Sequence, residues 1–310
     1  MPFRQAIDTI GLVNSGDDAF AIDAILRHHG LVASWRQLQP TGIANRIYAT
    51  DDVVIRVALD DAEALSDART EWVAAPVAHA AGVLTPRLIA ADHSRRLIAT
   101  PYSIWERVHG EALGQFARRA PVPQSTWQTI GRELARLHTE VRDCPDPHGW
   151  LEAHGPDDPR EALTVLARVG RLETQTVRSL EAWMSRLERR LVGTAPVRFV
   201  HGDLHEMNLM CRSDGALAAL IDWGDAGWGD PTLDFAALPV DSMTIALEAY
   251  EEIAPDILGD GVEARILWAR LTGALERMTM DPRRDGKLKE LMRFVAGPPP
   301  RWDAFAGSIV

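Results

Sequence analysis

The spacing of hydrophobic residues changes near residue 110, which divides the chain into two parts of different character. Before this point, apolar segments at 47–49 and 53–57 flank the turn residues 50–52, which predicts a β-hairpin. The same part predicts helices at 21–29 and 62–81, the second interrupted by Pro76, and extended segments at 96–100 and 102–108. The first hundred residues are therefore expected to be rich in β-structure.

Beyond residue 110, apolar residues recur at the three- and four-residue steps of amphipathic helices. Asp158 followed by Pro159 matches an N-cap residue followed by a proline at the first helical position. The sequence therefore predicts that a helix starts here. The clearest apolar stripe consists of Ile130, Leu134, Leu137 and Val141, and further helices are predicted at 177–191, 243–253 and 262–278. The sequence thus predicts an α+β fold with a small β-rich part and a larger, mainly helical part.

The composition, 46% hydrophobic and 25% charged over 310 residues, is typical of a globular protein with two lobes or two domains. No apolar run of signal-peptide length opens the chain, and no stretch approaches the roughly 18 apolar residues of a membrane span. We therefore expect a cytoplasmic protein that does not enter a membrane. The two cysteines, Cys144 and Cys211, are too few for a disulfide framework, and no Cys/His cluster predicts a zinc site.

The formal net charge of −11 argues against a nucleic-acid partner, because a phosphate-binding surface needs an excess of basic residues. The acidic balance suits a cationic small-molecule substrate, although a solubilising surface charge explains it equally well. Only two of the 33 basic residues are lysines, Lys287 and Lys289. A phosphate-binding site in the first half of the chain must therefore use arginine.

The segment 199–209 places Asp203 and Asn208 five positions apart between two apolar runs. Kinase catalytic loops use this spacing, with a carboxylate that accepts the hydroxyl proton and an amide that holds Mg²⁺ beside the phosphates. A turn at 213–215 and the apolar run 216–221 then lead to Asp222, which would be the second Mg²⁺ ligand. The order and spacing of these residues predict phosphoryl transfer.

The segments HGDLHEMNL, IDWGD and GDPTLDFA resemble the signature of the aminoglycoside phosphotransferase and choline-kinase-like superfamily. The resemblance extends from about residue 38 to 237 and implies a bilobal protein kinase-like fold, with lobes at 1–108 and 109–310. It implies that Asp203 is the catalytic base and that Asn208 and Asp222 bind Mg²⁺. Structural roles would fall to His201, Asp230 and Asp234, the two aspartates bracing the catalytic loop.

Kinases ordinarily hold the nucleotide with a strand lysine paired with a helix glutamate, and this part of the chain contains no lysine. Arg56, central in the strand predicted at 53–57, is the expected substitute, because a guanidinium can clasp two phosphate oxygens. Its partner is expected to be Glu71 rather than Glu63. By similarity, further nucleotide contacts would come from Gly42 and Asn45 in a phosphate-covering loop, from the Glu106 carbonyl and Val108 amide at the hinge, and from Ile221 packing against the base.

Acceptor recognition is expected in the helical part, and a carboxylate-lined cleft would attract a cationic compound. Glu206 and Asp225 are the first candidates, with Asp241, Glu248, Glu251 and Glu252 as further ones and Trp228 and Trp268 as possible walls. We therefore expect an O-phosphotransferase that uses Mg²⁺ and ATP or GTP to modify an aminoglycoside or other cationic antibiotic.

Three alternatives remain open from the sequence. One is a metabolic kinase of the same fold acting on choline, homoserine or a sugar, and another is a macrolide kinase. A non-catalytic nucleotide-binding pseudokinase would be expected to lose Asp203, Asn208 or Asp222, and all three are present. The sequence does not distinguish ATP from GTP or a monomer from a dimer.

Overall fold

The computed structural model describes residues 15–306 except 39–44, 156, 192, 194 and 282. Its N-terminal part is built on a five-stranded antiparallel sheet with the strand order β1-β2-β3-β5-β4. The elements of this part are α1 (Ser15–His28), β1 (Arg36–Leu38), β2 (Asn45–Ala49), β3 (Val53–Ala58), α2 (Ala62–Ala80), β4 (Leu88–Asp92) and β5 (Tyr102–Glu106). The predicted hairpin is β2-β3.

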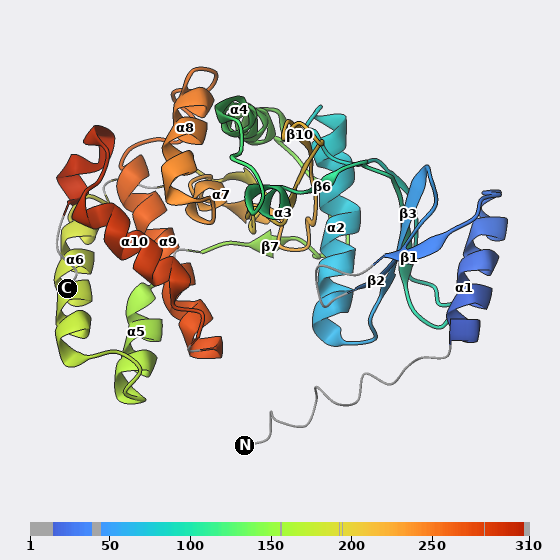
Figure 1. Ribbon diagram of the computed structural model, residues 1–310, viewed down its shortest axis with the longest axis horizontal. Coiled ribbons are helices and arrows are strands. Elements are labelled where there is room, and N and C mark those ends of the chain that lie inside the picture. The colour runs from blue at the N-terminus through green and yellow to red at the C-terminus, as the bar shows by residue number, and fades with distance from the viewer. Residues whose placement is uncertain are drawn as a thin grey trace.

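Helices α1 and α2 lie on opposite sides of this sheet (Figure 1). Alternate side chains of β3 point to opposite faces, as in any strand. Ile55 and Val57 are buried in a cluster with Ile22 and Ile25 of α1. Arg56 therefore points to the other face, toward α2.

Two details of this part differ from the sequence prediction. Residues 96–100 form bends rather than a strand, and the strand beside β5 is Leu88–Asp92. Leu97 and Ile98 are apolar because they pack onto the α1 side of the sheet from a loop. Pro76 does not interrupt α2, which continues to Ala80. Burial of Ala74, Ala75 and Ala78 on this helix outweighs the missing backbone hydrogen bond.

The C-terminal part is mainly helical, and its large hydrophobic core extends to buried residues of α2 such as Trp72 and Ala75. Its helices are α3 (Leu113–Ala117), α4 (Gln124–Glu140), α5 (Pro159–Arg168), α6 (Thr174–Glu188), α7 (Leu233–Ala236), α8 (Val240–Glu251), α9 (Val262–Met280), α10 (Gly286–Ala296) and the 3₁₀ helix η1 (Pro300–Phe305). The predicted start of α5 is confirmed, because the Asp158 carboxylate accepts a hydrogen bond from the Arg160 amide and Pro159 is the first helical residue. None of the described helices is long and apolar enough to span a membrane.

Two small sheets hold the segments that carry the kinase-like motifs. One has the order β10-β9-β6 and the other β7-β11-β8. Their strands are β6 (Glu111–Ala112), β7 (Glu152–Ala153), β8 (Arg198–Val200), β9 (Leu209–Cys211), β10 (Leu217–Leu220) and β11 (Gly227–Gly229). The loop 201–208 therefore connects a strand of one sheet to a strand of the other.

Helices α4 and α8 approach closely at Gly131, and this contact yields a stability prediction. A Cβ atom at Gly131 would lie 2.0 Å from the Ala246 carbonyl oxygen. We expect Gly131→Ala to lower the free energy of unfolding by about 1–3 kcal/mol, because the two helices must separate. Urea unfolding followed by circular dichroism measures this. Gly286→Ala is the matched control, since its Cβ would meet nothing within 4 Å, and equal midpoints for the two variants would contradict the prediction.

Candidate active site

Arg56 joins the N-terminal sheet to the motif-bearing loops. Its guanidinium forms an ion pair with the Glu71 carboxylate of α2, and its Nη2 donates to Asp222 Oδ1 at 3.1 Å. Glu71 is only 5% exposed, and its burial raises its pKa while Arg56 opposes this shift. The structure therefore brings the predicted pair Arg56 and Glu71 together with Asp222, which is 166 residues away from Arg56.

The loop between β8 and β9 is held by a buried aspartate. Asp234, at the start of α7, accepts hydrogen bonds from the backbone amides of His201 and Gly202, both at 3.0 Å. His138 Nε2 lies 3.0 Å from the same carboxylate, and both side chains are fully buried. Gly202 has φ +86°, and a Cβ there would lie 2.0 Å from the Asp225 carbonyl oxygen. The loop is thus anchored immediately before Asp203.

Asp230 makes other contacts than Asp234, and its part in bracing the loop 201–208 stays a prediction. Its carboxylate accepts hydrogen bonds from the Thr232 amide and hydroxyl and from Arg265. Among the described residues it makes no hydrogen bond to the loop 201–208. It stabilises the turn before α7 and joins that turn to α9.

Asp203 presents a partly exposed carboxylate, with 37% of the side chain accessible. Its Oδ2 lies 3.3 Å from His205 Nε2. Burial acts to raise the pKa of Asp203, but the His205 hydrogen bond and nearby positive charges outweigh it and hold the pKa below its usual value. The same contact raises the pKa of His205. Asp203 is therefore an ionised, accessible acceptor for a proton or a hydrogen bond.

Asn208 and Asp222 are positioned by neighbouring backbone contacts. The side-chain Nδ2 of Asn208 donates to the backbone carbonyl of Asp203 at 2.9 Å. The backbone carbonyl of Asn208 accepts a hydrogen bond from the backbone amide of Ile221 at 2.9 Å. His201 Nε2 lies 3.1 Å from the Ile221 carbonyl oxygen, which places the loop beside the segment that carries Asp222. Asp222 has φ +69°, a left-handed conformation uncommon for a residue other than glycine. Such backbone strain is often found at functional sites.

The donor set of this site fits Mg²⁺ bound with nucleotide phosphates. Because the side-chain Nδ2 of Asn208 donates to the Asp203 carbonyl, the side-chain Oδ1 of Asn208 is the atom available to a cation. The Asp222 side chain is 49% exposed. Both are the hard oxygen ligands that Mg²⁺ prefers. No group of three metal-binding side chains is assembled in the described part of the chain, so phosphates and water would have to complete the coordination.

Asp67 of α2 belongs to the same acidic surface and was missed by the sequence analysis. A Cβ at Gly224 would lie 2.8 Å from the Asp67 Cβ, so α2 packs directly against the segment after Asp222. Burial, together with the charges of Asp225 and Asp222, raises the pKa of Asp67 to about 6. The only sequence signal was its place one helical turn before Glu71.

His138 was also missed, although it lies in the apolar stripe of α4. Its Nε2 faces Asp234 and its Nδ1 lies 3.1 Å from the Tyr250 hydroxyl of α8. A buried histidine in an otherwise apolar stripe was the available signal. Its partners come from two other helices, so the sequence could not supply them.

Of the residues predicted to bind nucleotide, Gly42 lies outside the described residues. Asn45 begins β2 and pairs with Ala58 of β3. Glu106 ends β5, and its amide donates to the Arg87 carbonyl at 2.9 Å. Val108 lies just after β5, and its amide contact with the nucleotide base stays a prediction.

The candidate acceptor residues separate into two groups. Asp225 follows the Asp222 segment and keeps an exposed surface. Its carboxylate is nevertheless partly shielded from water by neighbouring groups, and this desolvation, with the charges of Asp203 and Asp222, raises its pKa. Glu206 lies in the loop 201–208, with its Cβ against Gly114. The other candidates make contacts elsewhere or none with the loop in the described part of the chain. Glu251, the last residue of α8, pairs with Arg301, and Glu252, just after α8, lies 3.7 Å from Arg132. No described hydrogen bond or ion pair joins Asp241 or Glu248 to the loop 201–208.

The candidate tryptophans have packing roles in this structure. Trp228 makes an edge contact with Phe199, with ring centroids 5.4 Å apart. Trp268 donates its indole hydrogen to the Asp157 carbonyl at 2.9 Å and stacks under Arg160.

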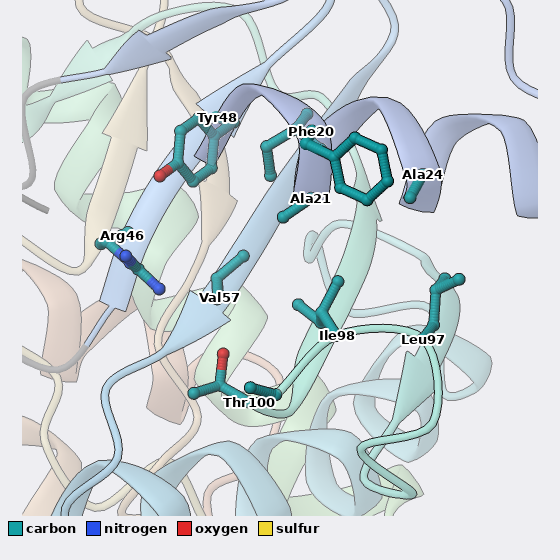
Figure 2. Close-up of a pocket in the computed structure, with 11 residues that line it drawn as sticks. Phe20, Ala21, Ala24, Arg46, Tyr48, Val57, Leu97, Ile98 and Thr100 are labelled. Carbon is teal, nitrogen blue, oxygen red and sulfur yellow. The ribbon is translucent and has the colours of Figure 1, made fainter. Parts of the chain in front are cut away.

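A cavity of about 390 Å³ lies on the other side of the N-terminal sheet and is separate from this site (Figure 2). Phe20, Ala21 and Ala24 of α1 line it on one side. Val57 also lines it, and this side chain points away from the face that carries Arg56. The cavity therefore lies on the face of the sheet opposite Arg56.

Asp234→Asn is expected to lower the free energy of unfolding by about 3–5 kcal/mol, because it removes the charge from a buried, fully bonded carboxylate. The His138 hydrogen bond and the backbone amides outweigh burial and hold the pKa of Asp234 below its usual value. Its contribution is therefore present above the unfolded-state pKa, about 3.9, and is lost as the pH falls through the lower folded-state pKa.

Chemical denaturation at a series of pH values tests this prediction. The free energy of unfolding of the variant should fall less between neutral and acidic pH than that of the wild type, because the variant has no Asp234 carboxylate to protonate. Asp51→Asn, at a site 97% exposed, is the control. A midpoint for Asp234→Asn equal to that of the control would contradict the assigned role of this buried network.

Comparison with known proteins agrees with this geometry. A family model described as the phosphotransferase enzyme family matches residues 35–272. The chain is 25% identical over 230 residues to viomycin phosphotransferase of Streptomyces vinaceus, covering 70% of this chain and 76% of that protein. A solved choline/ethanolamine kinase family protein from Mesorhizobium loti matches with a TM-score of 0.61 at 20% identity, covering 95% of this chain and 98% of the other.

A GDP complex of aminoglycoside 2'-phosphotransferase-IIIa matches with a TM-score of 0.60 at 16% identity, covering 88% of this chain and 96% of the other. These structural matches confirm the predicted protein kinase-like fold, with a β-rich N-terminal part and a helical C-terminal part. The family match covers most of the chain, from the edge strand β1 into α9. The chain therefore belongs to the phosphotransferase enzyme family.

Proposed function

We propose that this protein is a Mg²⁺-dependent O-phosphotransferase that transfers the γ-phosphate of ATP or GTP to a hydroxyl group of a small molecule. The observation that carries the proposal is the contact of Arg56 with both Glu71 and Asp222, beside the loop that holds Asp203 and Asn208. A strand cation paired with a helix glutamate, a proton acceptor and two cation ligands are the parts that kinase chemistry uses.

In this proposal each residue has a separate task. Asp203 orients the acceptor hydroxyl and accepts its proton, and Arg56 holds the nucleotide phosphates. Asn208 and Asp222 would hold Mg²⁺, which when bound neutralises phosphate charge. Catalysis would come chiefly from positioning and electrostatic stabilisation. The nucleotide base would lie at the hinge, near the Glu106 carbonyl and the Val108 amide, between lobes 1–108 and 109–310.

The proposed acceptor is an antibiotic, and the similarity to viomycin phosphotransferase supports this class. The acidic surface formed by Asp67, Asp203, Asp222 and Asp225 would favour a cationic group on the acceptor. A metabolic kinase of the same fold is the second candidate, since a choline/ethanolamine kinase family protein matches almost the whole chain in structure.

A coupled assay of nucleotide consumption with Mg²⁺ tests the proposed function. ATP and GTP should be combined with aminoglycosides, viomycin, macrolides, choline and homoserine, and mass spectrometry should look for the phosphorylated product. Turnover of an antibiotic supports the first candidate, and turnover only of a metabolite supports the second. A protein that binds nucleotide but neither hydrolyses nor transfers phosphate would contradict the proposal.

A further inference from the structure

A segment between α4 and α5, residues 146–154, connects α2 to the backbone that follows Asp222, and we call this segment the strap. It contains β7, which lies between α2 and α9 (Figure 1). The strap is folded at its first end, because the Asp146 carboxylate accepts a hydrogen bond from the Leu151 amide at 2.9 Å. It is therefore a structured connection between two parts of the molecule.

On one side the strap holds α2. The Thr70 hydroxyl donates to the Trp150 carbonyl at 2.7 Å, and Thr70 is only 1% exposed. The Arg69 guanidinium lies over the Trp150 ring, 6.0 Å from its centroid. The same ring makes an edge contact with His93, just beyond β4. Because Thr70 directly precedes Glu71, these contacts fix the turn of α2 that carries Glu71.

On the other side the strap holds the segment that follows Asp222. His154 Nε2 donates to the Asp225 carbonyl oxygen at 2.8 Å, since a carbonyl oxygen can only accept. The Glu152 amide donates to the Ala226 carbonyl at 3.3 Å, and the parallel pairing of β7 with β11 continues this contact. The strap therefore runs beside the backbone just after a candidate Mg²⁺ ligand.

The two elements held by the strap also meet each other directly. Arg56 contacts Glu71 of α2 and Asp222 at the same time. Asp67 of α2 lies against Gly224, where an added Cβ would be 2.8 Å from the Asp67 Cβ. Helix α2, the segment after Asp222 and the strap are thus in contact pairwise. This arrangement restricts movement of α2 relative to Asp222.

We propose that the strap is a positioning element for the nucleotide site, with Thr70 and His154 as its positioning residues. By holding α2 beside the segment after Asp222, it keeps Glu71 facing Arg56. This inference rests on the proposed function and adds two residues to it. Both residues donate to backbone carbonyls, so they act through the groups that they hold and not by contact with the phosphates.

The first test replaces Thr70 by valine, which has a similar size but no hydroxyl. The matched control is Thr126→Val, because Thr126 is also 1% exposed and its hydroxyl donates to a backbone carbonyl, that of Gly215, at 2.8 Å. Thr70→Ser is the conservative variant that keeps the hydroxyl. Calorimetry measures the affinity for non-hydrolysable ATP and GTP analogues with Mg²⁺, and urea unfolding measures stability.

We expect Thr70→Val to weaken nucleotide affinity by roughly 3- to 10-fold, as is common when a contact couples to a distant site. Thr70→Ser should restore most of the affinity. Thr126→Val should lose a similar amount of stability, since it also removes one buried hydroxyl, but should bind nucleotide like the wild type. Wild-type affinity in Thr70→Val, or an equal loss of affinity in Thr126→Val, would overturn the proposal.

The second test needs no nucleotide and follows backbone hydrogen exchange by mass spectrometry. Without its tie to the strap, α2 should open more often, so amides within 62–80 should exchange about 3- to 10-fold faster in Thr70→Val than in Thr126→Val. Equal exchange in the two variants would overturn the proposal. A protein that binds neither nucleotide would contradict the proposed function, and the exchange rates would still decide whether the strap positions α2.

The double variant Thr70→Val/His154→Ala tests whether the two sides of the strap act as one element. Either change releases the strap at one side, so the second change should add little to the first. We expect the double variant to weaken nucleotide affinity by less than the product of the two single effects. An effect equal to that product would show two independent contacts and would overturn a single positioning element.

Discussion

Asp203→Asn should reduce kcat by roughly 10²- to 10⁴-fold and leave nucleotide affinity nearly unchanged, because asparagine keeps the shape of the side chain but cannot accept the hydroxyl proton. The local structure should survive the exchange. Asp234 anchors the loop through the backbone amides of His201 and Gly202, and Asn208 contacts the backbone carbonyl of Asp203. Steady-state kinetics and calorimetric nucleotide binding measure the two quantities separately.

The control for this variant is Asp214→Asn. Asp214 lies in the turn between β9 and β10 and is 68% exposed, so the same chemical change occurs in the same motif-bearing region but outside the site. The control should keep wild-type kcat. An unaltered kcat in Asp203→Asn would remove this residue from the reaction, and a lost nucleotide affinity would mean that it acts through nucleotide binding.

Arg56→Met is expected to raise the nucleotide KM strongly and to lower kcat/KM by about 10²- to 10³-fold. It removes the cation proposed to bind the phosphates, and it leaves the Glu71 carboxylate buried without its partner. The variant should also be less stable, because an uncompensated buried charge costs about 3–5 kcal/mol. Kinetics with varied nucleotide and thermal unfolding measure these effects.

The double variant Arg56→Met/Glu71→Gln separates the effect of Arg56 on nucleotide binding from its effect on the stability of the fold. Neutralising Glu71 should recover much of the stability, whereas the nucleotide defect should remain. Arg95→Met is the surface control, since Arg95 and its partner Asp60 are both exposed. Recovery of nucleotide use in the double variant would show that Arg56 serves only to neutralise Glu71, contrary to its proposed role.

Local chemistry made much of the candidate site predictable. The spacing of Asp203, Asn208 and Asp222 depends on one loop and one hairpin, and both features are encoded by adjacent residues. Arg56 could be inferred because strand alternation opposes it to Ile55 and Val57, and because lysine is absent from that part of the chain. The pairing of Arg56 with Glu71 in the structure agrees with that reasoning.

Patterns with more than one structural solution were resolved only by packing. The apolar residues near 97 suggested a strand, but they cover the α1 cluster from a loop, while Leu88–Asp92 pairs with β5. Asp230 and Asp234 look equivalent in sequence, yet Asp234 accepts a hydrogen bond from the His201 amide, whereas Asp230 pairs with Arg265 of α9. A short motif does not specify which carboxylate faces inward, because that depends on the orientation of the helix in the tertiary fold.

The sequence by itself determined which candidate groups this protein offers: a strand arginine, Arg56, followed by Asp203, Asn208 and Asp222 in the order expected of a kinase. The tertiary structure decided which other charges meet them. It brought Asp67 against Gly224, placed His138 beside Asp234, and paired Glu251 with Arg301. These contacts join residues far apart in the chain, and only the packing of whole helices sets them, so no local spacing could have encoded them.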